Sequence, residues 1–69
     1  MPLTMARPGE SGRIRKIGGK PETRRFLENL GFVAGGKVSV IAVIGGNVIA
    51  EIKGTRVAVN RDMAAKILI

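Results

Sequence analysis

Two adjacent glycines interrupt the longest uncharged apolar run of this chain, and this interruption constrains the fold more than any other feature. The run extends from Val38 to Ala50, with Gly45-Gly46-Asn47 near its centre. These three residues tolerate positive φ and are typical of a short hairpin connection. The run is too short to span a bilayer as a helix. The sequence therefore predicts no membrane insertion and two antiparallel strands, over Lys37–Ile44 and Val48–Lys53.

The composition indicates that most of the remaining structure is also β. Val and Ile supply 15 of the 69 residues, whereas Leu supplies only 4, and β-branched residues favour strands. A chain of this length forms one domain, so we expect a single domain over residues 1–69. Further strands are predicted over Ser11–Gly18 with a bulge, over Arg56–Val59 after a Gly54-Thr55 turn, over Ile67–Ile69, and at an edge beginning near Leu3.

One segment, about 21–30, has the features of an α-helix. Pro21 suits the first helical position, where its missing N–H has no intrahelical partner to lose. An apolar face is expected from Phe26, Leu27 and Leu30, which recur at helical spacing. Gly31 then suits a left-handed helix end, and Phe32 would pack back onto Leu27.

A second, shorter helical turn is predicted near 61–66. Asn60 is a favourable N-cap residue for it, and Met63 and Ile67 would be buried. Short strands at regular spacing with turn residues between them are typical of a small barrel. The predicted fold is therefore mainly β, a small barrel with one inserted helix and one helical turn.

The side chains that most enzymes and metal sites need are scarce in this sequence. The chain contains neither Cys nor His, which removes thiol chemistry, the commonest general base and the commonest metal ligand. Its five carboxylates are not closely paired in sequence, and its two serines have no histidine partner. We therefore expect a protein that is not an enzyme, with no cofactor and no metal site.

The net charge of +7 predicts attraction to an acidic partner. The cations that could form one positive face are Arg13, Arg15, Lys16, Lys20, Arg24 and Arg25, provided that the strand and the helix lie side by side. A solvated surface explains the same charges about equally well. A nucleic-acid-binding barrel is the alternative function, but such barrels stack bases on aromatic side chains, and this chain has no Tyr or Trp. Nucleic acid is therefore the less favoured partner. Met1–Gly9 has no continuous apolar core of the kind a signal peptide carries, so a cytoplasmic location is expected.

The order of motifs resembles a known family. Gly9-Glu-Ser-Gly12 precedes Arg13-Ile-Arg-Lys-Ile17-Gly-Gly19, and Arg24-Arg-Phe-Leu27 precedes Leu30-Gly31-Phe32-Val-Ala-Gly35. After the glycine hairpin come Lys53-Gly54-Thr-Arg-Val-Ala-Val59 and Ala64-Ala-Lys-Ile67. Over nearly its whole length the chain is similar to the ferrous iron transport protein A (FeoA) family. The Leu-Gly-Phe-x-x-Gly segment after the helix is the most specific part.

The resemblance implies an SH3-like β-barrel and a cytosolic accessory role in bacterial ferrous iron uptake. The implied partner is ferrous iron transport protein B, a membrane permease with a cytosolic GTP-binding domain. Two partner-binding surfaces are predicted, the basic residues Arg13, Arg15, Lys16, Arg24 and Arg25, and the loop residues Phe32, Val33, Ala34 and Gly35. A purely local helix cap is the competing interpretation of the loop. Ala34 stands where family members often have Pro, which leaves this loop less rigid.

Overall fold

A four-stranded antiparallel sheet with the order β1-β3-β4-β5 is the largest element of the computed structural model, which describes residues 1–69. Its central hairpin joins β3 (Lys37–Ile44) to β4 (Asn47–Ile52), which confirms the two predicted strands within about a residue. Gly45 and Gly46 form the turn with φ of 56° and 83°. Positive φ at both central residues is the type I′ geometry whose twist matches the strands.

The segment Ser11–Gly18 is not one bulged strand as predicted. It forms β1 (Ser11–Arg13) in the large sheet and β2 (Lys16–Ile17) in a second sheet with β6 (Ile67–Leu68). The chain changes sheets between them, because the Ile14 N–H donates to the Gly36 carbonyl while the next N–H, of Arg15, donates to the Leu68 carbonyl. This crossover, rather than a bulge, produces the three-residue spacing of Ile14 and Ile17, both of which are buried.

Two other boundaries differ from the prediction. The turn before β5 (Thr55–Val59) consists of Lys53 and Gly54, one residue earlier than expected, with φ of 52° and 78°. The N-terminal segment forms a short 3-10 helix, η1 (Leu3–Met5), instead of a strand. Buried Leu3 anchors η1 in the core, and the only β-bridge of this segment joins Pro2 to Leu68.

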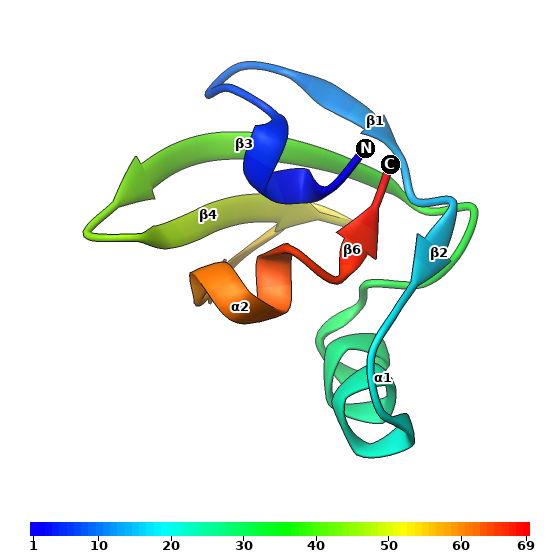
Figure 1. Cartoon of the computed structure of the whole chain (residues 1–69). Coiled ribbons are helices and arrows are strands. Elements are labelled where there is room, and N and C mark those ends of the chain that lie inside the picture. Colours follow the sequence, from blue (N-terminus) through cyan, green and yellow to red (C-terminus); the bar gives the residue numbers. More distant parts are fainter.

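The core consists of fourteen buried residues, all of them hydrophobic. It lies between the large sheet and a layer formed by η1, α2 (Arg61–Ala64) and the β2–β6 sheet, which share one side of the large sheet in Figure 1. No strand pairing joins the two sheets, so hydrogen bonds do not close the barrel. Packing across the core therefore holds the two layers together.

Helix α1 (Pro21–Leu30) begins at the predicted proline but buries a narrower face than predicted. Leu27 is fully buried and Leu30 packs against the core, whereas Phe26 is 48% exposed. Figure 1 shows α1 at one end of the molecule, beyond the layer that covers the sheet. Because little of the domain lies beside it, only the central stripe of the helix is covered.

The second helix is shorter than the predicted 61–66 turn. α2 ends at Ala64, and the Asn60 side chain accepts a hydrogen bond of 2.8 Å from the Met63 N–H, as expected of an N-cap. Ala64 and Ile67 are buried and Met63 is half-buried. Neither helix is long and apolar enough to cross a membrane.

Candidate docking surface

Arg13 and the loop after α1 form one connected unit. The Arg13 guanidinium donates to the Gly35 carbonyl at 2.9 Å. Beside this contact, the Gly35 N–H donates to the Ile14 carbonyl at 2.7 Å and the Ile14 N–H donates to the Gly36 carbonyl at 2.8 Å. The loop is thus fastened to the end of β1 by three hydrogen bonds. Two of the predicted site residues, Arg13 and Gly35, are in direct contact.

Within this loop, exposure decreases sharply toward the helix. Ala34 and Gly35 are exposed and Val33 is half-buried. The Phe32 side chain is fully buried, and its N–H donates to the Leu27 carbonyl at 3.0 Å. Gly31, with φ of 111°, completes a Schellman-type helix end. Phe32 therefore anchors the loop in the core, and the surface available to a partner is limited to Val33, Ala34 and Gly35.

Arg15 and Lys16 lie where the chain passes from one sheet to the other. Both are exposed, and Lys16 begins β2, opposite Leu68 of β6. Ile17 follows Lys16 and is buried. Since successive strand residues point to opposite faces, the buried isoleucine fixes the Lys16 side chain outward.

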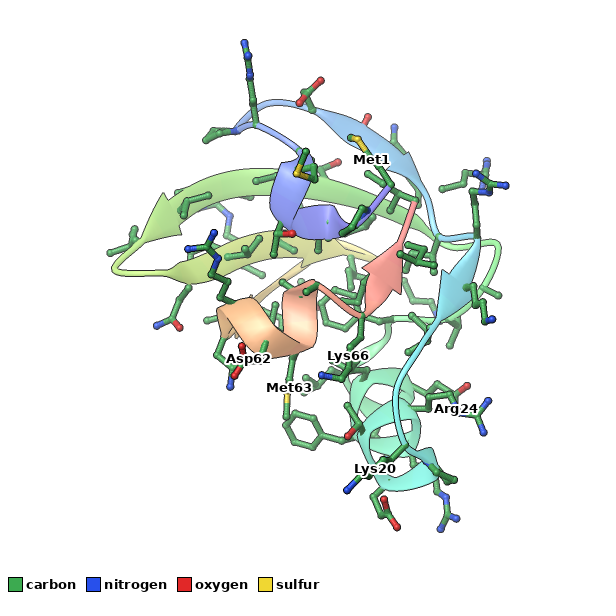
Figure 2. All side chains as sticks on the ribbon, viewed as in Figure 1. Met1, Lys20, Arg24, Asp62, Met63 and Lys66 are labelled. Atoms are coloured by element: carbon green, nitrogen blue, oxygen red, sulfur yellow. The ribbon has the colours of Figure 1, made fainter.

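Arg24 and Arg25 are exposed on α1, about 100° apart around the helix axis. Figure 2 shows the Arg24 side chain directed away from Lys20, Lys66 and Met63, which lie on the other side of α1 in this view. The five cations come from two parts of the chain, Arg13, Arg15 and Lys16 from the strand segment and Arg24 and Arg25 from α1.

None of these five cations is neutralised by a carboxylate. The one ion pair of the structure joins Arg56 and Glu51 at 4.0 Å, and both side chains are substantially exposed. Such a pair contributes little to stability. The only polar contact of the five side chains is the Arg13–Gly35 hydrogen bond. Their charges are therefore available to carboxylates of another molecule.

The structure contains no cluster of three or more acidic side chains that could hold a metal ion. The chemistry that the surface offers is electrostatic attraction and backbone hydrogen bonding. The Arg13–Gly35 contact was missed in the sequence because it joins residues 22 positions apart. The pairing of β1 with the start of β3, where Arg13 lies opposite Lys37, brings the two residues together.

Comparison with known proteins bears on this surface. The family model described as "FeoA domain" matches residues 1–69. A relative from Methanocaldococcus jannaschii, named putative Fe(2+) transport protein A, is 34% identical over 68 residues, covering 99% of this chain and 83% of the relative. This chain belongs to the FeoA family. The family is implicated in ferrous iron transport and is not a known family of enzymes.

Solved FeoA structures share the fold. The crystal structure of an iron uptake regulatory protein (FeoA) has a TM-score of 0.89 and 27% identity, covering 96% of this chain and 88% of that chain. FeoA of Stenotrophomonas maltophilia, described as a procaryotic SH3 domain protein and solved with zinc, has a TM-score of 0.82. It is 23% identical, covering 99% of this chain and 87% of that one. These likenesses confirm the predicted SH3-like fold, which here consists of two sheets that do not close.

Proposed function

We propose that this FeoA-family chain is a non-enzymatic docking module of ferrous iron uptake. In this proposal it is a single domain over residues 1–69 that acts in the cytoplasm. Its partner is the cytosolic part of the membrane permease, ferrous iron transport protein B. Docking would modulate iron passage or nucleotide turnover by the permease.

The observation that carries the proposal is the set of unpaired, exposed cations beside a fastened loop. The strand group consists of Arg13, Arg15 and Lys16, and the helix group consists of Arg24 and Arg25. Arg13 is held by the Gly35 carbonyl, so part of its conformational entropy is already lost before a partner binds. The exposed loop residues Val33, Ala34 and Gly35 provide uncharged contact area next to this arginine.

Electrostatic complementarity chiefly determines the rate and specificity of association. A partner for this surface carries carboxylates that reach both cation groups. Because exposed charges are screened within about 8 Å at physiological salt, binding through them weakens as salt is added. A binding interface with these properties suits a regulator that associates reversibly.

Affinity capture from cells tests the proposal. The tagged protein is incubated with detergent-solubilised cells of its own organism at physiological salt, with and without nuclease. We expect recovery of a large GTP-binding membrane permease in both samples. Recovery of ribosomal or nucleoid proteins that disappear after nuclease treatment would contradict the proposal and favour the nucleic-acid-binding barrel.

A further inference from the structure

The large sheet has a second face that no part of the domain covers. Its inner face carries Val38, Val40, Val48, Ala50 and Val59, all of them buried. The elements η1, α2 and β6 cover that side (Figure 1). The residues that alternate with the buried ones along each strand point to the other side, which we call the outer face.

Strand register arranges the outer face into two rows. Ser39 pairs with Glu51, which pairs with Arg56, and this forms a polar row across β3, β4 and β5. Further along the same strands, Ala42 pairs with Ile49 and Ile49 pairs with Ala58. The second row is entirely apolar. Ile44, which is 64% exposed, extends it toward the hairpin turn.

A β-bulge in β3 determines which side chains of this strand join the apolar row. Val38 and Val40 face inward, so strict alternation would also turn Ala42 and Ile44 inward. The register shift between Val40 and Ala42 reverses the alternation. As a result Ala42 lies beside outward-facing Ile49, while Val43 lies beside buried Val48. Bulges commonly redirect side chains at functional positions. Strict alternation would have placed Ile41 and Val43 on the outer face, and the bulge places Ala42 and Ile44 there instead.

The opposite end of the outer face is basic. A shallow pocket of about 370 Å³ lies there, lined in part by Lys37, Ser39, Glu51 and Lys53. Glu51 is paired with Arg56, and neither lysine has an acidic partner. The outer face therefore changes along the strands from apolar at the hairpin end to cationic at the end where β3 begins.

We propose that the outer face binds an amphipathic α-helix of a partner protein, with acidic residues in its first turn and aliphatic residues beyond. Three strands spaced about 4.8 Å apart make the apolar row roughly 10 Å wide, which matches the diameter of one helix. A helix layer is one of the standard ways in which an apolar sheet face is covered. Carboxylates in the first turn are favoured by the helix dipole.

The length of the outer face along the strands is compatible with a helix of a few turns. Ile49 and Lys53 are four residues apart in sequence, which corresponds to about 13 Å of strand. Three turns of helix span about 16 Å. Three turns therefore reach from the lysines to the apolar row. A fourth turn is needed to reach Ile44, because its partner Asn47 is six residues, about 20 Å, from Lys53.

The basic end adjoins the docking surface, because Lys37 pairs with Arg13 of β1. The apolar row contains no residue of that surface, so the inference does not rest on the proposed function.

Titration of the isotope-labelled protein with two synthetic helices tests the inference. The acidic probe has about 18 residues, with glutamates in the first turn and leucines along one face of the remaining turns. The control probe has the same leucines and lysines in place of the glutamates. We expect the acidic probe to shift the amide resonances of Ala42, Ile49, Ala58 and Lys37. The lysine probe is expected to bind at least about tenfold more weakly.

Two variants locate the site. Ile49→Thr keeps a β-branched side chain and removes the apolar contact, and Ala58→Glu places a negative charge at an exposed position of the row. Each variant is expected to bind the acidic probe about tenfold more weakly than the unmodified protein does. Phe26→Ser, a matched change of an exposed apolar residue on α1, is expected to leave the affinity unchanged.

Three results would overturn the inference. The first is that no amide resonance of an outer-face residue shifts when the acidic probe is added up to roughly 1 mM. The second is binding that both variants leave unaltered. The third is a dimer in analytical ultracentrifugation that Ile49→Thr converts to a monomer, because a second copy would then occupy this face.

Discussion

The N–H of Phe32 donates to the carbonyl of Leu27 at 3.0 Å, and both side chains are completely buried. Together with the Gly31 N–H, which donates to the Glu28 carbonyl at 2.9 Å, this connection ends α1, and the buried Phe32 ring anchors the following loop in the core. Arg13 then holds the outer part of the loop through Gly35. The candidate docking surface is thus built directly on the core, so its shape depends on the packing beneath it.

The two phenylalanines should respond very differently to truncation. Phe32→Ala removes a fully buried ring and is expected to lower the free energy of unfolding by about 3–5 kcal/mol. Phe26→Ala changes a side chain that is 48% exposed and should cost less than about 1 kcal/mol. Urea denaturation measures both. Equal losses for the two variants would contradict the burial described for α1.

Replacement of Gly31 by alanine should destabilise the helix end. The residue has φ of 111°, and an added Cβ would lie 3.3 Å from Cγ2 of Ile52. A non-glycine residue in such a conformation costs about 1–3 kcal/mol. Gly18→Ala is the matched control, because Gly18 has no positive φ and its nearest neighbour would lie at 3.6 Å. A Gly31→Ala protein as stable as the control would rule out the left-handed cap.

Replacing a glycine of the hairpin turn should raise stability, in contrast to the Gly31 substitution. Gly45 has φ of 56°, and a Cβ added there would have no other atom within 4 Å. Asparagine is well tolerated at this position of a type I′ turn. Gly45→Asn should raise the free energy of unfolding by about 0.4–1 kcal/mol, since it restricts the unfolded chain. Thermal denaturation followed by circular dichroism measures the gain. A loss of stability would indicate a different turn geometry.

Asn60 should contribute to stability through its cap of α2. Asn60→Ala removes the acceptor of the 2.8 Å hydrogen bond from the Met63 N–H and should cost about 1 kcal/mol. For a domain of this size, that loss lowers Tm by roughly 4–8 °C. Asn60→Asp keeps the acceptor and should retain most of the stability. If Asn60→Asp is as unstable as Asn60→Ala, the side-chain hydrogen bond of the cap does not account for the loss of stability.

Local sequence signals predicted the elements whose determinants are close together in the chain. Pro21 and Gly31 bound the helix as expected, and Gly45-Gly46 formed the central hairpin. The change of sheet at Ile14 and Arg15 could not be read in the same way, because their hydrogen-bond partners, Gly36 and Leu68, are distant in sequence. Phe26 was assigned to the buried face because helical spacing identifies a stripe but not how wide a neighbour covers it.

The two surfaces differ in how much the sequence could reveal. The cations of the docking surface are evident from composition and spacing, and the structure adds the Arg13–Gly35 contact and the absence of an ion pair to any of the five. The β3 residues that belong to the apolar row are set by the bulge between Val40 and Ala42, and their neighbours by the register of three strands. Simple alternation assigns Ile41 and Val43 to this face, whereas the structure places Ala42 and Ile44 there.

Direct titration of the purified permease with this protein is the most decisive measurement for the docking role. Arg24→Glu/Arg25→Glu is compared with Arg7→Glu/Arg61→Glu, a matched pair that also lowers the net charge from +7 to +3. We expect the first variant to bind at least about tenfold more weakly at low salt and to lose most of its salt dependence. The control should bind nearly as the wild type does. Unchanged affinity and salt dependence in the first variant, or equal losses in both, would contradict docking through these arginines.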